Sequence, residues 1–510
     1  MSLFKGTQLL PLDDRTEGMV LKSAPYALPL FLMGVAAFPL PSGSSELGNC
    51  LPRQINLRNR VTRAFPERFE TYRLDTYQGL ERMRNPETGL IRDKILVRRT
   101  DSGDATFRIL NDNTSATNIG LDILNQIGKV EEGLEAPASR KNLEQVVSSL
   151  EKISFHRDSG LFYSWYSTAR GFTVVNRDVS SVDNIHLALA LWTVKETYHG
   201  TPLSQRAGKL LERMDFSVFY SSNTGLMAGN LKHHQGHWAL ENYQFANLGS
   251  EARSIYALTW ALGLLKRAAD PRMAEKSSSS LAAETYVWND AGTERRILRT
   301  WDGGAFQLLL PKLLLNEERY SPQLEGSFDG YARYILAEGQ RQGFPVPAAH
   351  SASNYGIDDE PTFSEVPSYH GKAGSTALVC TDHVDLNNPH ERSLWDLVYT
   401  PHASLIAATA DPERFAAILK RSESLRSGND VLYVPGFGFL DGYHVKGRYA
   451  GQVVPVQISL DQGMIALALG QMRAKDGLSP SGRALMHNSA VQARLSQYYD
   501  LIDRKLAPLR

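Results

Sequence analysis

This chain of 510 residues has few cysteines, no formal net charge and few long apolar runs. Its two cysteines, Cys50 and Cys380, lie far apart and cannot by themselves build a disulfide framework or a metal site. Lysine plus arginine and aspartate plus glutamate number 55 each, so the formal net charge is +0. Without a basic excess the chain lacks the charge by which proteins follow a nucleic-acid backbone or an anionic membrane. We therefore expect no nucleic-acid partner and a neutral or locally charged ligand.

The apolar stretch of residues 25–40 is too short to span a bilayer and is interrupted by prolines, so we expect no stable membrane span. Read from Met19, with Lys22 before it and small residues at 42–44 behind it, the stretch resembles a signal peptide. The alternative is a packed N-terminal arm of residues 1–60. The signal-like pattern slightly favours a periplasmic or secreted location over a cytoplasmic one.

Cofactor motifs are missing as well: the chain has no Walker loop and no dinucleotide fingerprint after a strand. His233, His234 and His237 lie close together, but their spacing matches no common zinc motif. A polar loop or a sugar-contacting rim is the expectation there. We expect neither a metal nor a cofactor, and the sequence says nothing about the oligomeric state.

A helical period dominates the chain from Thr117 onward, with Gly, Pro and Asn in the gaps between apolar repeats. Clear β-alternation is scarce outside short runs such as 431–434, and the serine-rich stretch 276–280 is expected to be a surface loop. The spacing predicts helices through residues 119–127 and 143–153, and over 182–198, 207–214, 251–266, 306–315, 328–341, 403–410, 412–424, 464–472 and 490–506.

Many helices of similar length joined by irregular loops indicate an array of α/α hairpins. Closed into a ring of six hairpins, such an array forms a toroid with a central cleft; left open, it forms a solenoid. The absence of a short repeat of fixed sequence favours a toroid of diverged hairpins. We therefore predict an all-α chain whose residues 61–510 form an (α/α)6 toroid, preceded by the N-terminal arm.

Two carboxylates near the C-terminus stand in glycine- and aromatic-rich surroundings: Asp441 within residues 436–443 and Asp461 within residues 458–464. An aromatic face stacks on the C–H face of a pyranose, and a carboxyl group moves protons or attacks the anomeric carbon. The pattern therefore indicates carbohydrate chemistry, and two turn-forming aspartates beside glycine are the alternative. Candidate stacking platforms, each with a core role as its alternative, are Trp165, Trp301, Tyr355 and Tyr443.

Two further acidic positions lie at predicted helix starts. Asp183 follows the aromatic cluster of residues 162–166, and serving the helix macrodipole is its alternative role. Glu251 and Arg253 stand at the front of a strongly apolar helix. They form either a capping glutamate with a surface arginine or a buried pair that keeps a hydroxyl-binding carboxylate ionised.

Taken in order, several motifs resemble those of the glycoamylase-like hydrolases, including the endo-β-1,2-glucanases, and of the related domain of cyclic β-1,2-glucan synthases. The match covers roughly residues 105–475 and implies a six-hairpin α/α barrel that acts on glucans, typically β-1,2-linked. It also implies acidic active-site residues at Asp183, Glu251, Asp441 and Asp461. The motifs are residues 113–120, 162–166, 181–184, 250–253, 301–307 with Leu310-Pro311, 438–441 and 461–464.

The chain departs from this pattern in one place. Where the synthase-like relatives carry Ser-Glu-Ser after a Pro-Trp-Gly stretch, residues 347–354 read PAAHSASN, so His350 stands in place of a carboxylate. Either Asp358, Asp359 or Glu360 substitutes for it, or the linkage specificity differs, or the chain does not catalyse.

The sequence thus predicts a glycoside hydrolase acting on a β-linked glucan or a related bacterial polysaccharide, and the resemblance favours inversion of the anomeric configuration. Glu251 and Asp441 would transfer protons, with Asp183 and Asp461 positioning the sugar ring. Arg253 and His350 are further candidates for substrate contact. A transglycosylase, a phosphorylase with a phosphate pocket at His350, His370 and Lys372, and a non-catalytic polysaccharide-binding protein are the alternatives.

Overall fold

The computed structural model describes residues 68–510 except for 101, 301–302, 342, 344–352, 355–368, 371–375, 379, 381–397, 446–449 and 508–510. The described residues all belong to the compact unit Arg53–Arg510. The N-terminal arm predicted over residues 1–60 lies outside them, as do Trp301, His350 and Tyr355.

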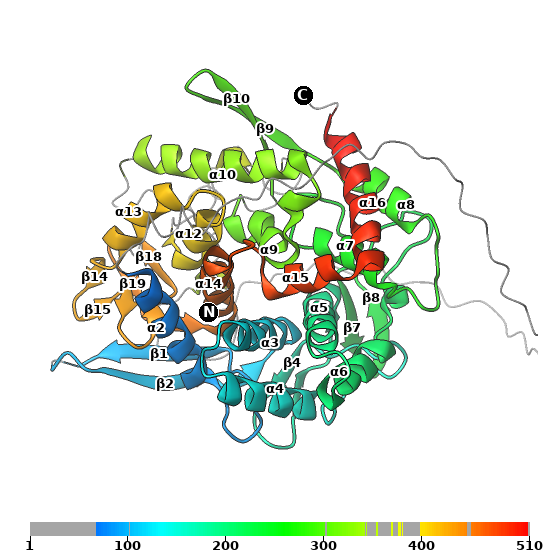
Figure 1. The fold of residues 1–510 in the computed structure, drawn as a ribbon, viewed down its shortest axis with the longest axis horizontal. Coiled ribbons are helices and arrows are strands. Elements are labelled where there is room, and N and C mark those ends of the chain that lie inside the picture. Colours follow the sequence, from blue (N-terminus) through cyan, green and yellow to red (C-terminus); the bar gives the residue numbers. More distant parts are fainter. Residues whose placement is uncertain are drawn as a thin grey trace, which may run out of the picture. The chain divides into compact units, whose positions relative to one another are not determined.

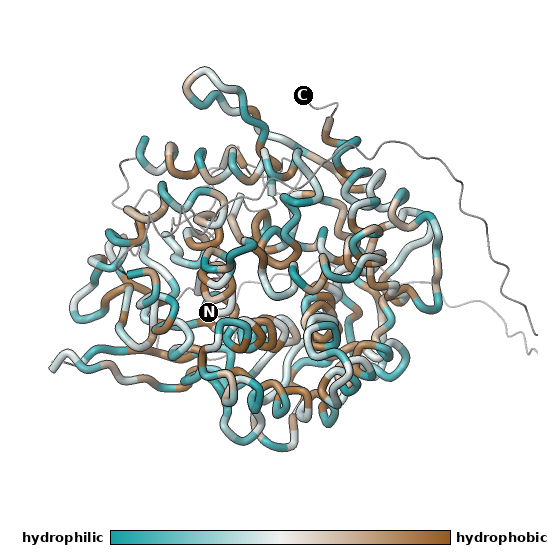
Figure 2. Tube along the Cα trace, viewed as in Figure 1, coloured by the Kyte–Doolittle hydropathy of each residue, from teal (hydrophilic) through white to brown (hydrophobic). Residues whose placement is uncertain are grey.

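One set of helices is buried on nearly all sides and forms a closed series of contacts (Figure 1). In chain order each of these helices packs against the next, and α14 packs back against α3. Helices that are apolar all round belong in a protein interior, and Figure 2 shows long brown segments on α3 and α5. The helices of this ring are α3 (Ala116–Glu131), α5 (Ser181–Thr197), α7 (Arg253–Leu262), α9 (Ala305–Leu315), α12 (Pro401–Ala408) and α14 (Ser459–Arg473).

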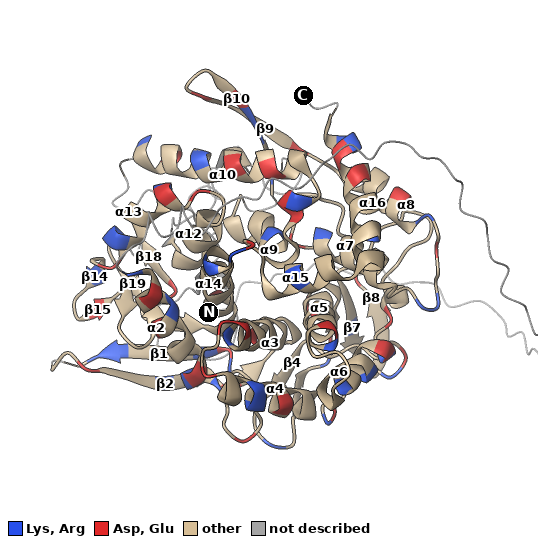
Figure 3. Ribbon diagram, viewed as in Figure 1, with Lys and Arg blue, Asp and Glu red and all other residues tan. Residues whose placement is uncertain are grey.

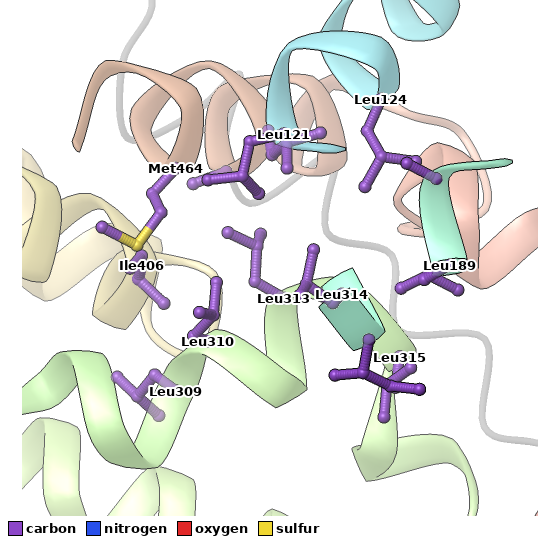
Figure 4. Close-up of a cluster of buried hydrophobic side chains, with 14 of the residues drawn as sticks. Leu121, Leu124, Leu189, Leu309, Leu310, Leu313, Leu314, Leu315, Ile406 and Met464 are labelled. Atoms are coloured by element: carbon purple, nitrogen blue, oxygen red, sulfur yellow. The ribbon is translucent and has the colours of Figure 1, made fainter. Parts of the chain in front are cut away.

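The ring helices meet through a dense aliphatic core. Figure 4 shows leucines of α3, α5 and α9 lying together with Ile406 of α12 and Met464 of α14. The run Leu308–Leu310 and Leu313–Leu315 of α9 is fully buried, which explains why this helix carries almost no polar residues. Burying one such side chain contributes about 1.5–3 kcal/mol, so the convergence of these chains is the main force that closes the ring.

A second set of helices covers the ring from outside. These helices are amphipathic: α6 buries Leu203, Ala207, Leu210 and Leu211 and exposes the rest of its surface. The helix α2 packs on α14, α4 on α3, α6 on α5, α8 on α7, and α13 on α12, while α10 contacts α12. Their bounds are α2 (Phe69–Met83), α4 (Ala136–Leu150), α6 (Pro202–Arg213), α8 (Met273–Ser280), α10 (Pro322–Arg341) and α13 (Pro412–Ser422).

Two C-terminal helices complete the α-helical part. The helix α15 (Pro480–His487) contacts α3, α5 and α9, and α16 (Ser489–Leu506) packs on α7 and α8. None of the helices that the structure describes is both long and apolar enough to cross a membrane. Figure 3 shows acidic and basic residues interspersed along helices and hairpins, in keeping with a formal net charge of +0.

Short antiparallel strands fill the connections between helices, so the prediction of an all-α chain is correct only for the dominant elements. The longer hairpins were not anticipated because much of β2 faces solvent, with Phe107 and Ile109 exposed, which weakens the alternating pattern. The longer strands are β1 (Lys94–Arg99), β2 (Ala105–Asn111), β7 (Asn230–His234), β8 (His237–Leu240), β9 (Thr285–Asp290) and β10 (Thr293–Leu298).

The remaining strands have two or three residues each. They pair in the sheets β3-β4-β5, β6-β7-β8 and β13-β18-β19, in the pairs β11-β12, β14-β15 and β16-β17, and through β20 onto β1. They are β3 (Asn113–Thr114), β4 (Trp165–Ser167), β5 (Val174–Asn176), β6 (Val179–Ser180), β11 (Ser353–Asn354), β12 (Tyr369–His370), β13 (Val398–Tyr399), β14 (Arg426–Ser427), β15 (Asp430–Val431), β16 (Tyr433–Val434), β17 (Gly438–Phe439), β18 (Gly442–His444), β19 (Val453–Val454) and β20 (Val456–Ile458).

The serine-rich stretch 276–280 is the C-terminal part of α8 and not the predicted surface loop. Serine competes with the helix backbone for hydrogen bonds, which is why such a run reads as a loop. Here Ser277 is buried and its Oγ donates to Met273 O at 2.8 Å, so tertiary packing keeps the segment helical.

Candidate functional site

The starts of the ring helices carry most of the polar side chains that the sequence pointed to. An α-helix start leaves backbone N–H groups unpaired and carries a positive partial charge, so it stabilises carboxylates and other acceptors. Side-chain and backbone hydrogen bonds connect several neighbouring starts. The residues concerned are Thr117 and Asn118 of α3, Asp183 of α5, Glu251 just before α7, Gln307 of α9, His402 of α12 and Asp461 of α14.

Asp183 joins the starts of α5 and α3. Its backbone N–H donates to the Ser180 hydroxyl, which caps the helix, and its Oδ1 accepts from Thr117 Oγ1 at 2.6 Å. The side chain is partly exposed. Burial raises the pKa of Asp183 above its usual range, and the hydrogen bonds from Thr117 and Ser180 partly oppose that shift.

Asp461 lies at the start of α14 beside His402 at the start of α12. His402 Nδ1 is 3.4 Å from Asp461 Oδ2, and both side chains are buried. Asp461 also acts on a further buried carboxylate, Asp93, whose pKa is raised first by burial and additionally by the charge of Asp461. Asp93 Oδ1 accepts from Asn118 Nδ2 at 3.2 Å, and the Asp93 carbonyl accepts from Ser459 N at 2.8 Å. Asp93 therefore connects the starts of α3 and α14.

Asp441 lies between β17 and β18 and is 1 % exposed. Its backbone N–H donates to Val456 O at 2.8 Å, in the strand β20 that leads directly into α14. The fold thus holds Asp441 beside β20, the strand that directly precedes the helix carrying Asp461. Tyr443 follows on β18, pairs with Tyr399 and Val453, and remains partly exposed.

Glu251 lies in the turn before α7 and is partly exposed. The Ser250 hydroxyl is 3.1 Å from both Glu251 Oε2 and Gln307 Oε1, and its single proton can be donated to either of these two acceptors. Glu251 N also donates to Gln307 Oε1 at 3.4 Å. Gln307, at the start of α9, therefore holds both the backbone and the side-chain neighbour of Glu251.

Arg253 is buried beneath this turn and pairs with Glu317, so neither alternative for Arg253, a surface position or a buried pair with Glu251, is correct. Nε donates to Glu317 Oε1 at 2.9 Å and Nη2 to Oε2 at 2.6 Å, a bidentate geometry. The remaining donors reach the carbonyls of Ser250, Gln307 and Leu308. Arg253 thus ties the turn before α7 to the start of α9, a positioning role in place of the predicted sugar contact.

One aromatic cluster of the described residues forms around Trp238 on β8, which the sequence prediction did not single out. Tyr163 stacks parallel to Trp238 with ring centroids 5.9 Å apart. His156 and His233 approach the same indole at 4.5 and 4.6 Å. The predicted platform Trp165 begins β4 and is partly exposed.

The histidine-rich segment forms the hairpin of β7 and β8. Its turn residues Gln235 and Gly236 both have positive φ, the geometry of a tight two-residue hairpin turn. His234 and His237 pair across it and are exposed. The described residues contain no group of three or more His, Cys, Asp or Glu side chains that could hold a metal ion.

A pocket of about 520 Å³ lies elsewhere, toward the C-terminal ends of α3 and α14, with Tyr77 and Asn125 in its wall. Its carboxylates are already engaged by arginines: Glu131 pairs with Arg483, and Glu132, also in the wall, pairs with Arg73. Paired carboxylates at helix C-termini are poorly placed to bind hydroxyls or transfer protons. We therefore locate the candidate site at the helix starts.

The structure thus brings sequence-predicted carboxylates to helix starts and adds residues the sequence did not single out. His402 is the second residue of α12, and His186 stands just after the first turn of α5. For both, a polar residue in an apolar helix is the signal in the sequence. Asp93 precedes a strand that was not predicted, so nothing marked it. The alternatives Asp358, Asp359 and Glu360 to His350 lie outside the described residues.

Neither a protein-family model nor a curated protein matches the chain. Solved structures do. An endo-β-1,2-glucanase from Chitinophaga pinensis, in complex with sophorotriose and glucose, is 15% identical with a TM-score of 0.61, over 84% of this chain and 97% of that one. An endo-β-1,2-glucanase from Talaromyces funiculosus with sophorose is 12% identical with a TM-score of 0.67, over 88% and 92%.

A β-1,2-glucanase from Parabacteroides distasonis is 13% identical with a TM-score of 0.59, over 85% of this chain and 59% of that one. These likenesses show the fold: the chain is helix-rich and shares its overall architecture with these glucanases, which are of the glycoamylase-like α/α-barrel type. The predicted resemblance to this group is confirmed at the level of fold.

Proposed function

We propose that the chain is a glycoside hydrolase that cleaves a β-linked glucan, with β-1,2-glucan as the first substrate to test. One observation carries the proposal: Asp183, Glu251 and Asp461 stand at the starts of ring helices in a fold shared with endo-β-1,2-glucanases. The fold alone would not suffice, because one fold serves many chemistries. Carboxylates at one kind of position on three of the ring helices are the chemical part of the argument.

The arrangement of the helices into a six-hairpin toroid belongs to the same proposal. The closed series of contacts from α3 through α5, α7, α9, α12 and α14 back to α3 supports it. So does the regular alternation along the chain of a ring helix with a covering helix. In such a toroid the ring helices run parallel, and their starts face one end of the barrel.

Within this site Glu251 and Asp441 transfer protons, while Asp183 and Asp461 hold hydroxyls of the sugar ring. One carboxylic acid protonates the glycosidic oxygen, and the other carboxylate draws a proton from a water that attacks the anomeric carbon. We propose inversion, in which the two carboxyl groups stand about 6.5–9.5 Å apart to admit the water. The Ser250 hydroxyl, which lies between Glu251 and Gln307, holds the Glu251 carboxyl group in place. The backbone hydrogen bond from Asp441 to Val456 fixes the segment that carries the Asp441 carboxyl group.

The test is product analysis after incubation with linear β-1,2-glucan and a panel of other β-glucans, with and without phosphate. Asp441→Asn runs beside the unmodified chain, and Asp500→Asn, at an exposed position of α16, is the matched control. We expect short oligosaccharides that disappear with Asp441→Asn alone. Phosphate dependence would establish a phosphorylase instead, and binding without any product would establish a non-catalytic role.

A further inference from the structure

A buried hydrogen-bond chain runs from His186 through Thr117 to the candidate site residue Asp183. Thr117 Oγ1 lies 2.6 Å from Asp183 Oδ1 and 3.1 Å from His186 Nδ1. Asp183 and His186 are three residues apart on α5 and so project from the same side of that helix. Thr117 faces them from the first turn of α3, and both Thr117 and His186 are buried.

Proton counting assigns the direction of each hydrogen bond. The Thr117 hydroxyl has one proton, and an ionised Asp183 can only accept, so Thr117 donates to Asp183. Thr117 must then accept from His186 Nδ1, which therefore carries the imidazole proton. His186 Nε2 is buried without a hydrogen-bond partner among the described residues, which is tolerable for a bare lone pair but costly for a stranded N–H.

The close approach of the two helices at this point is built into the sequence. A Cβ added at Gly120 would lie 3.0 Å from His186 O and 3.2 Å from Leu187 Cα, tighter than ordinary contacts. A side chain at position 120 would push α3 and α5 apart by a few tenths of an ångström, and the Thr117–His186 distance depends on their close approach. Burial lowers the pKa of His186 to about 4, so the ring is neutral near neutral pH and stays compatible with this arrangement.

We infer that His186 is a positioning residue that, in its Nδ1–H tautomer, holds Thr117 so that Thr117 fixes one carboxylate oxygen of Asp183. The effect of this positioning on catalysis rests on the proposed function, in which Asp183 binds a hydroxyl of the sugar. The geometry itself does not rest on it. Asp183 then meets a sugar hydroxyl in a preset orientation and needs no reorganisation when substrate binds.

The tautomer is tested by long-range ¹⁵N–¹H NMR on the full chain labelled at histidine, near neutral pH. The His186 signals are identified by their loss in His186→Asn. If His186→Asn fails to fold, they are identified by their shift in Thr117→Val. We expect a protonated Nδ1 and a bare Nε2. We also expect Thr117→Val, which removes the acceptor, to change the tautomer. A protonated Nε2 in the unmodified chain overturns the inference whether or not the protein cleaves glucan.

The effect on the site is tested with threonine variants assayed on the glucan that the chain cleaves. We expect Thr117→Val to lower kcat/KM by about 10- to 100-fold, the loss of a hydrogen bond to a charged group, and Thr117→Ser to restore most of it. The matched control is Thr193→Val, because the buried Thr193 hydroxyl donates only to Leu189 O of its own helix. Unchanged kcat/KM in Thr117→Val, or an equal loss in Thr117→Ser, contradicts the role assigned to the chain of hydrogen bonds.

Discussion

The guanidinium of Arg253 lies against the carboxylate of Glu317, with Nη2 2.6 Å from Oε2 and Nε 2.9 Å from Oε1. Both side chains are fully enclosed, and Tyr499 adds a third donor to Glu317 at 2.9 Å. The other Arg253 donors reach the carbonyls of Ser250, Gln307 and Leu308, so this buried pair orients the side chain that ties the turn carrying Glu251 to the start of α9.

Arg253→Met should therefore destabilise the protein by about 3–5 kcal/mol, because it leaves the charge of Glu317 buried without its partner. The free energy of unfolding from urea titrations measures the change. Arg206→Met is the control: Arg206 pairs with Glu144 and Glu151 near the surface, where such pairs are worth about 1 kcal/mol or less. Equal costs for the two variants would contradict the structural role of the Arg253–Glu317 pair.

Asp183→Asn should stabilise the protein at neutral pH. The pKa of Asp183 is raised in the folded protein, so as pH rises the unfolded chain loses this proton first, and folding is progressively disfavoured. The cost is absent below the unfolded pKa and complete above the folded one. Asparagine removes it and still offers Oδ1 to Thr117.

Melting temperatures near pH 7 and near pH 3, above and below the ordinary aspartate pKa of about 3.9, measure this effect. The gain of Asp183→Asn over the unmodified chain should be larger at the higher pH. A gain that is larger at the lower pH would show that folding lowers the pKa of Asp183 and would contradict the upward shift assigned to desolvation.

Glu251→Gln and Asp441→Asn should each lower kcat on the cleaved glucan by about 10²–10⁴-fold, the usual contribution of a general acid or base. Both changes are isosteric and keep the contacts of the backbone at these positions, so the fold should be retained. Circular dichroism and melting curves check the fold. A variant that retains kcat within about twofold while remaining folded removes that residue from the proton-transfer role.

Gly120→Ala should destabilise the protein by about 1–3 kcal/mol, because its Cβ would press on the backbone of His186 and Leu187. Gly326→Ala is the opposite case: it lies in α10 with nothing within 4 Å of the added Cβ. That change should stabilise by about 0.5–1 kcal/mol through the better helix propensity of alanine. Urea unfolding of both variants should give changes of opposite sign, and a stable Gly120→Ala would show that α3 and α5 can separate.

The ring helices were predictable because they are long and strongly periodic. The predicted segment 182–198 differs from α5 by one residue at each end, and the predicted segment 306–315 differs from α9 by one residue at its start. Their polar first-turn residues were also visible, because an acidic residue directly before a strongly apolar run can be read from the sequence. Short strands such as β20 were not, because two or three residues carry no period, and their partners come from distant parts of the chain.

The sequence pattern could not predict which side chains form ion pairs and hydrogen bonds with one another. Glu251 and Arg253 are near neighbours in the sequence, yet the partner of Arg253 is Glu317, and Asp183 finds its partner in Thr117 on another helix. Residues two apart on a helix point in different directions, so sequence proximity misleads there, and only the packing of one helix on the next decides the contact.

By itself, the sequence determined that this chain is a helix-rich protein with carboxylates at helix starts, because hydrophobic period and helix capping are local properties. Which helices meet, and hence which side chains share a proton or a charge, was decided by the tertiary structure. The physical reason is that the aliphatic core around α9 and the absence of a side chain at Gly120 set the distances between helices. Hydrogen bonds such as the one from Thr117 to Asp183 form only after those distances are fixed.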